Sequence, residues 1–120
     1  MADDIISALM NEVDNLRNAL EGVKYDHGKP RWDLLPFDSL DDVAKVLAHG
    51  AEKYGDNNWT KGMNWGRLLA ACLRHLSAWA RGQDIDEESG LSHLAHAACC
   101  ALMLLALQKR RVGTDDRIKL

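Results

Sequence analysis

The chain has 120 residues, enough for one domain with a hydrophobic core but with a large surface relative to its volume. Its 15 Lys and Arg residues are outnumbered by 18 Asp and Glu residues, so the formal net charge is -3. This balance excludes a broad basic surface for non-specific binding along a nucleic-acid backbone. We therefore expect one domain and no stable nucleic-acid partner.

Three cysteines and one apolar segment indicate the cellular compartment of the protein. Cys72, Cys99 and Cys100 are odd in number and lie in apolar stretches, so we interpret them as buried thiols of a reducing compartment. The opening Met-Ala-Asp-Asp lacks the basic start and apolar run of a secretory signal. Residues 91–107 contain two histidines and are too short to span a bilayer, so they predict a buried helix. We expect a cytoplasmic protein without a membrane partner.

Four helices are predicted from apolar periodicity, and no strand pattern competes with them, so the fold class is all-α, a bundle of about four helices. The first helix spans about residues 3–21 and ends at Gly22, with an apolar stripe along one face. A lone amphipathic helix cannot bury its own stripe, so this one should pack on the domain or on a second copy of the chain. We treat residues 1–22 as a separate N-terminal helix.

Residues 23–38 hold both prolines and predict a loop. The loop is expected to carry an apolar plug, made of Leu34, Leu35 and Phe37. The second helix is predicted to begin at Ser39 as N-cap, with Asp42 at the capping-box position, and to end at Gly55.

The third helix is predicted over about residues 64–81, with Gly82 at its C-terminal cap. The fourth is predicted to start at Ser89 or Gly90 and to run to Arg111, apolar on nearly every side. Such a helix is normally enclosed by neighbours, and another subunit would supply them, so we expect a homo-oligomer, either a dimer or a tetramer. Residues 23–111 form the predicted helical domain, and residues 112–120 a polar tail.

Residues 84–96 concentrate groups that bind cations or transfer protons. Two explanations account equally well for the acidic residues here. They complement the dipole at the start of the predicted fourth helix, or they bind Mg²⁺ or Mn²⁺. These residues are Asp84, Asp86, Glu87 and Glu88. A calcium loop of the EF-hand type is excluded, because Gly90 stands at the seventh loop position instead of the sixth and Ala95 at the twelfth.

His93 and His96 share one face of the predicted fourth helix, where imidazoles suit a transition metal or acid–base chemistry. Their spacing matches no zinc motif, and a histidine on an apolar face is more often a structural core residue. The same two interpretations apply to His75. Glu52 follows His49 by one helical turn and either joins the acidic segment around a cation or belongs to an ordinary helix end, with Lys53 near the C-terminal dipole.

Arg67, Arg74 and Arg81 recur every seven residues, which is typical of a solvated helix face but also suits bidentate binding of phosphates. Further cations and tryptophans lie in the loops, where a base could stack on an indole. These residues are Lys29, Arg31, Lys61, Trp32, Trp59 and Trp65. Because the chain has no Walker or Rossmann glycine signature, phosphate binding would depend on side chains and a metal ion.

Five ordered blocks carry a resemblance to a known family. They are KYDHGKP at 24–30, LLP at 34–36, GAEKYG at 50–55 with Asn58 and Trp59, RHLSAW at 74–79, and DEESGLSHLAHA at 86–97. Over about residues 24–107 the chain resembles the phage-associated dATP/dGTP diphosphohydrolase N-terminal domains. That family groups with the MazG-like all-α nucleotide pyrophosphohydrolases, helical oligomers that cleave a (deoxy)nucleoside triphosphate to the monophosphate and pyrophosphate with Mg²⁺ or Mn²⁺.

The resemblance implies metal-assisted attack of water on the α-phosphorus of dGTP or dATP, in the host cytoplasm if the chain is phage-encoded. MazG-like enzymes carry Glu-x-x-Glu and Glu-x-x-Asp on consecutive helices, and this chain has neither. The nearest counterparts by spacing are His49-x-x-Glu52 and His93-x-x-His96, and imidazoles shift the metal preference from Mg²⁺ toward Mn²⁺. Either the metal differs, or the acidic segment supplies the oxygens, or activity has been lost.

The resemblance and the residue chemistry together yield a predicted site. The predicted metal ligands are Glu52, Asp86, Glu88, His93 and His96. The predicted catalytic residues are Glu52, His75, Glu88 and His93. The predicted substrate-binding residues are Lys29, Arg31, Lys53, Asn58, Trp59 and Arg74.

Two other classes compete with this prediction. A catalytically silent assembly module would use its helices only to bury one another across a dimer or tetramer, and its acidic segment would be plain surface. A metal-dependent phosphohydrolase of the HD type needs a His-Asp doublet, whereas this chain has only Asp26-His27, in the reverse order.

Overall fold

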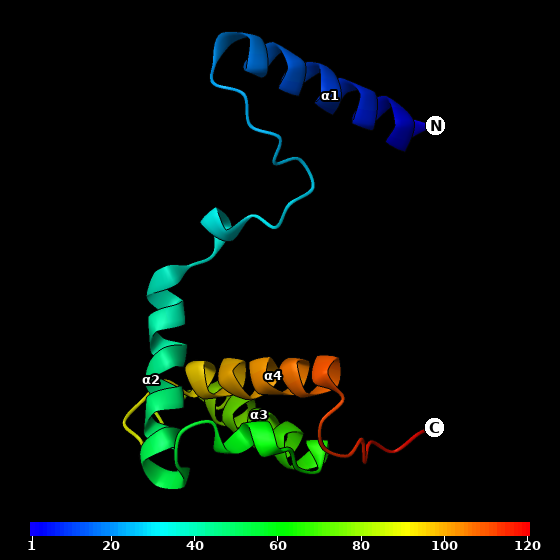
Figure 1. Ribbon diagram of the computed structural model, residues 1–120. Coiled ribbons are helices and arrows are strands. Elements are labelled where there is room, and N and C mark those ends of the chain that lie inside the picture. Colours follow the sequence, from blue (N-terminus) through cyan, green and yellow to red (C-terminus); the bar gives the residue numbers. More distant parts are fainter. The chain divides into compact units, whose positions relative to one another are not determined.

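A computed structural model describes residues 1–120 and contains only helices and loops (Figure 1). The elements in chain order are α1 (Ala2–Leu20), the 3₁₀ helix η1 (Trp32–Leu34), α2 (Phe37–Tyr54), the 3₁₀ helix η2 (Asn58–Lys61), α3 (Trp65–Ala80) and α4 (His93–Arg110). The prediction of an all-α fold with four helices is confirmed. The chain divides into two compact units, Met1–Leu34 and Leu35–Leu120.

The first unit consists of α1, a loop and η1. None of the residues of α1 is buried, and side chains of its apolar stripe such as Ile6 and Leu16 are 49% and 60% exposed. The first unit therefore contains no partner for this stripe, as expected for a single amphipathic helix.

The second unit is built on the antiparallel pair α3 and α4, and α2 packs against α4 (Figure 1). Midway along the pair, the Cys72 thiol donates a hydrogen bond to the Ala97 carbonyl, with 3.4 Å between sulfur and oxygen. A core cluster formed by Val46 of α2 with Ala95 and Cys99 of α4 joins the two helices. Partly buried apolar side chains extend this cluster, namely Val43, Leu47, Leu91 and Met103.

The cysteines follow the prediction of buried free thiols. Cys99 and Cys100 are buried, Cys72 is half-buried, and none forms a disulfide. Burial disfavours the thiolate and raises the pKa of Cys99 to about 11. No helix combines the length and the apolar character that crossing a membrane requires, which agrees with the prediction for residues 91–107.

The predicted N-cap of α2, Ser39, is wrong by three residues, because the N-cap is Pro36. The helix begins at Phe37, directly after Pro36, whose carbonyl accepts hydrogen bonds from the amides of Ser39 and Leu40. Ser39 therefore lies inside the helix and does not cap it, because proline sets the backbone for a helix start without needing an amide proton. Within the second unit, the predicted plug residue Phe37 is 58% exposed, so it does not enter the core of that unit.

The predicted start of α4 is wrong as well. The helix begins at His93, and its N-cap is Ser92, whose hydroxyl accepts a hydrogen bond from the Ala95 amide. Ser89 lies outside the helix because its hydroxyl is bonded to Asp86. At the other end, residues beyond α4 return to the start of α3, where Trp65 donates from its indole nitrogen to the Val112 carbonyl at 2.9 Å.

Candidate functional site

The segment between α3 and α4 folds back on itself as a short hairpin-like loop. An antiparallel bridge joins Ile85 and Ser92, and the Asp86 amide donates to the Leu91 carbonyl at 2.8 Å. Inside this loop one carboxylate oxygen of Asp86 accepts from both the amide and the hydroxyl of Ser89, at 2.9 and 2.7 Å. The loop therefore holds the Asp86 carboxylate in a defined position.

Three imidazoles from the facing surfaces of α3 and α4 meet beside this carboxylate. The Nδ1 atoms of His75 and His93 are 2.9 Å apart, so one of them donates a hydrogen bond to the other. The ring of His75 also stacks on that of His96, with 4.3 Å between centroids and 10° between planes. His93 is only 7% exposed. A shared proton and a stacked pair thus fix the three rings at the contact between the helices.

His96 is fixed by the same loop as Asp86. Its Nε2 atom lies 2.7 Å from the Ser89 hydroxyl, whose single proton goes to the Asp86 carboxylate. The hydroxyl must then accept the hydrogen bond from His96, so Nε2 carries the proton. Ser89 therefore links the histidine to the carboxylate, and the Nε2 lone pair of His96 is not available to a ligand.

Burial and neighbouring charges set the ionisation of the cluster. Burial is the main cause that lowers the pKa of His75 and of His96, which favours the neutral form of both rings. Burial of Asp86, the largest single effect, opposes its ionisation, but the two hydrogen bonds from Ser89 together with the nearby His96 and His75 outweigh burial, and the pKa of Asp86 is lowered. An ionised carboxylate beside neutral imidazoles is the state in which both kinds of side chain bind metal ions.

His75, Asp86 and His93 form a candidate metal centre. One potential ligand atom from each of these residues lies within 4.8 Å of the other two. Two imidazole nitrogens bound to one ion at right angles would be about 3 Å apart, given metal–nitrogen bonds of about 2.1 Å. The observed 2.9 Å between the Nδ1 atoms of His75 and His93 agrees with that separation. The donor set of two imidazoles and one carboxylate suits Mn²⁺ or another first-row metal ion better than Mg²⁺.

An open cavity of about 1320 Å³ adjoins the cluster, which is enough for a nucleotide. His75 and Asp86 line it, whereas the buried His93 does not. Other predicted site residues also line it, namely Lys53, Asn58, Trp59, Arg74, Glu88 and His96. Lys53 on α2 donates to Glu88 at 2.7 Å, and this hydrogen bond is the main cause that lowers the pKa of Glu88 and raises that of Lys53. The cavity thus combines acids, cations and an aromatic side chain.

One predicted site residue of the second unit is not brought into this group, and two others belong to the first unit. Glu52 is exposed on α2 and does not line the cavity. Lys29 and Arg31 belong to the first unit, where Arg31 forms a bidentate pair with Asp33 at 2.8 and 2.7 Å. The parts assigned to these three residues stay predictions.

Two residues of the site were not assigned a role from the sequence. Ser89 connects Asp86 with His96, and the signal that could have revealed it is the Asp-x-x-Ser spacing, which is typical of side-chain-stabilised turns. His49 of α2 lines the cavity with its ring 6.4 Å from that of His96. The sequence shows only its spacing from Glu52, because its proximity to α4 depends on helix packing.

Comparison with known proteins bears on what this cluster does. The family described as dATP/dGTP diphosphohydrolase, N-terminal, matches residues 19–117, which include the whole cluster. The chain belongs to this family. The resemblance drawn from the five sequence blocks is thereby confirmed.

A dATP/dGTP diphosphohydrolase of Salmonella phage PMBT28 is 40% identical to the chain over 98 residues. These residues are 82% of this chain and 33% of the phage protein, so the chain spans about a third of the relative that it matches. No solved structure matches the chain.

Proposed function

We propose that the chain is the catalytic domain of a metal-dependent pyrophosphohydrolase that converts dGTP or dATP to the monophosphate and pyrophosphate. The observation that carries the proposal is the meeting of His75 and Asp86, at the wall of a cavity that Lys53 and Trp59 also line, with His93 buried behind them. The phage relative is named for dATP and dGTP, and its name supports this choice of substrates.

The residues that would hold the ion are His75, Asp86 and His93, because their potential ligand atoms lie closest together. A divalent ion bound there would neutralise phosphate charge and lower the pKa of water, which is the usual contribution of metals to phosphoester hydrolysis. Ser89 and His96 would act through Asp86 by fixing its orientation. That the metal ion is also bound directly by Glu52, Glu88 or His96 stays a prediction.

The reaction would replace one phosphorus–oxygen bond by another. The oxygen of water forms a bond to the α-phosphorus, and the bond from that phosphorus to the bridging oxygen of the β-phosphate breaks, so that pyrophosphate leaves with the electron pair. Lys53 would exchange its partner Glu88 for a substrate phosphate, and the released Glu88 carboxylate would take the proton of the attacking water. Trp59 offers a surface on which a purine base would stack.

The direct test is to incubate the purified chain with dGTP and Mn²⁺ and to measure pyrophosphate. We expect release by the unchanged chain and by Glu87→Ala, a control whose side chain does not line the cavity. Glu88→Ala should abolish release. Full activity of that variant would refute the assignment of Glu88.

An assembly module without catalysis is the second candidate, and one observation favours it. The outer faces of α3 and α4 expose large apolar side chains, among them Leu73, Leu94, Leu102 and Leu105 at 54%, 43%, 50% and 52%. Such a surface suits a second copy of the chain, in a dimer or tetramer. If assembly is the function, Glu88→Ala and His93→Ala would leave it intact, whereas Leu102→Asp would disrupt the oligomer measured by light scattering.

A further inference from the structure

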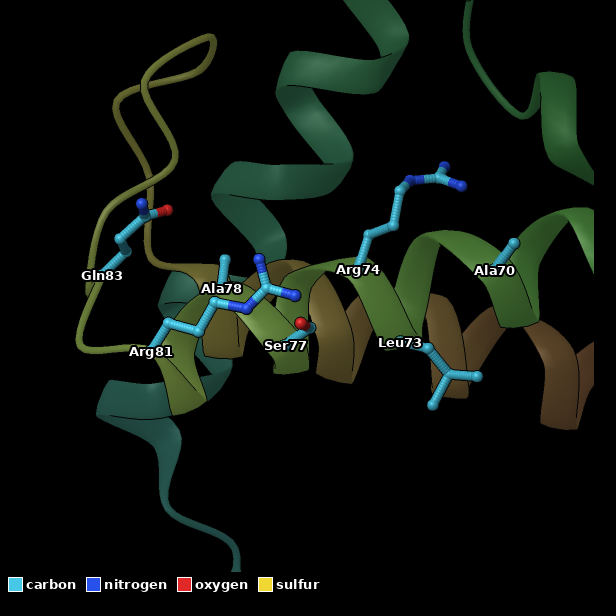
Figure 2. Close-up of a pocket in the computed structure, with 7 residues that line it drawn as sticks. All are labelled: Ala70, Leu73, Arg74, Ser77, Ala78, Arg81 and Gln83. Atoms are coloured by element: carbon cyan, nitrogen blue, oxygen red, sulfur yellow. The ribbon is translucent and has the colours of Figure 1, made fainter.

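A second, smaller pocket of about 420 Å³ lies along α3, on the side that carries its arginines (Figure 2). Arg74 and Arg81 extend from the same side of the helix, whereas Leu73 points the opposite way. Gln83 reaches the pocket from the loop that follows the helix, and Ser77 lies between the two arginines along the chain. No acidic side chain lines this pocket, so its polar groups are cationic or neutral.

The two arginines of this pocket have no carboxylate partner. Three other arginines of the chain, Arg17, Arg31 and Arg117, each form an ion pair with an aspartate two or three residues away. Arg74 and Arg81 form no such pair, although they are seven residues apart on one helix and thus about 10 Å apart along its axis. Two unpaired guanidinium groups at that spacing suit an extended polyanion, because each binds a phosphate group through two hydrogen bonds.

The pocket and the large cavity share two lining residues. Ala70 and Arg74 line both, and Arg74 directly precedes His75 of the candidate metal centre. A phosphate chain whose first phosphorus lies at His75 and Asp86 would therefore meet Arg74 next and Arg81 last. The purine-stacking candidate Trp59 lines only the large cavity, so the base and the distal phosphates would have separate places.

We infer that the pocket bounded by Arg74, Ser77, Arg81 and Gln83 binds the β- and γ-phosphates of the substrate and then the pyrophosphate that leaves. The inference rests on the proposed function for the direction of the substrate. It assigns Arg81 and Gln83 a part in substrate binding. Charge neutralisation by the two arginines would stabilise the pyrophosphate as its negative charge develops, while Ser77 and Gln83 donate neutral hydrogen bonds.

Binding of inorganic tripolyphosphate to the 120-residue chain tests the pocket without hydrolysis. Calorimetry in EDTA removes any contribution of a bound divalent ion. We expect Arg81→Gln to weaken binding at least about tenfold, since a hydrogen-bonded charge pair typically contributes that much. Arg81→Lys keeps the charge but not the paired N–H donors of a guanidinium group, so it should weaken binding less than Arg81→Gln does. Gln83→Ala should weaken binding about threefold. Lys109→Gln removes the same charge from the end of α4, outside both cavities, and should bind as the unchanged chain does.

The variants separate this inference from the proposed function. His93→Ala should retain tripolyphosphate binding while losing hydrolysis of dGTP. A different outcome is that the unchanged chain binds tripolyphosphate through Arg81 and yet does not hydrolyse dGTP. That result would support the pocket as a polyphosphate site and refute the proposed function. Equal affinities of Arg81→Gln, Gln83→Ala and the unchanged chain would overturn the inference, provided that circular dichroism shows the same helix content. So would binding of a DNA oligonucleotide without binding of tripolyphosphate.

Discussion

The inner and outer faces of α3 and α4 use their side chains in opposite ways. On the inner faces His75, His93 and His96 each contact another ring or a hydroxyl, and no buried polar side-chain atom lacks a partner. On the outer faces Leu73 and Leu105 are 54% and 52% exposed and pack in no core, although the helices are the same. Partners on the inside hold the side chains where the proposed metal centre needs them, whereas the exposed apolar side chains on the outside are available to a second chain.

Among substitutions on the two faces, those of the inner histidines are expected to have the largest effect on activity. His93→Ala removes one candidate ligand and the hydrogen-bond partner of His75, and should lower pyrophosphate release from dGTP by about 10³-fold or more. It should also abolish Mn²⁺ binding measured by calorimetry. Glu87→Ala, whose side chain does not line the cavity, is the control and should change neither quantity. Retention of Mn²⁺ binding by His93→Ala would show that the ion lies elsewhere.

Substitutions at two leucines, two residues apart on α4, allow the stabilising contributions of the two faces to be compared directly. Leu107 is fully buried and Leu105 is 52% exposed. Leu107→Ala should lower the free energy of unfolding by about 2–5 kcal/mol through the cavity it leaves. Leu105→Ala should cost less than about 1 kcal/mol if the outer face is open to solvent. A larger cost that grows with protein concentration in urea unfolding would mean that a second copy covers this face.

The buried Cys99 is expected to make the free energy of unfolding depend on pH in the alkaline range. Its pKa in the folded chain is raised to about 11, above the ordinary value of 9.0. The neutral thiol is the buried form, so this contribution is fully present below pH 9 and is lost as the pH rises to 11. It amounts to about 2–3 kcal/mol, at 1.36 kcal/mol for each unit of pKa. Cys99→Ala should flatten the fall in unfolding free energy over that range. An equally steep fall in Cys99→Ala would assign the pH dependence to other groups.

The smallest effect is expected at Ser89, which acts through Asp86 and His96. Ser89→Ala leaves the candidate ligands in place but removes the hydroxyl that fixes two of the groups, so pyrophosphate release should fall about tenfold. Raising the Mn²⁺ concentration should restore part of it, because the defect would lie in metal affinity. Ser92→Ala, which removes the α4 cap instead, should lower stability by about 1 kcal/mol and should not respond to Mn²⁺.

Sequence reasoning succeeded where the signal is local. Apolar periodicity placed all four helices, and the composition of residues 84–96 identified the segment that holds Asp86 and His93. It failed at the starts of α2 and α4, where two residue types compete for one role. Pro36 starts α2 ahead of the predicted cap Ser39, and Ser89 bonds to Asp86, leaving the cap of α4 to Ser92.

The sequence by itself determined the helical class, the family and which residues carry donor atoms, because each depends on residue identity and near neighbours. Only the tertiary structure decided which donors meet. His75 and His93 are eighteen residues apart, and their contact follows from the antiparallel register of α3 on α4. Glu52, equally suited by chemistry, remains outside the cavity because its side chain lies on the exposed side of α2. The physical reason is that packing of helix faces is a long-range interaction, which local periodicity limits but does not specify.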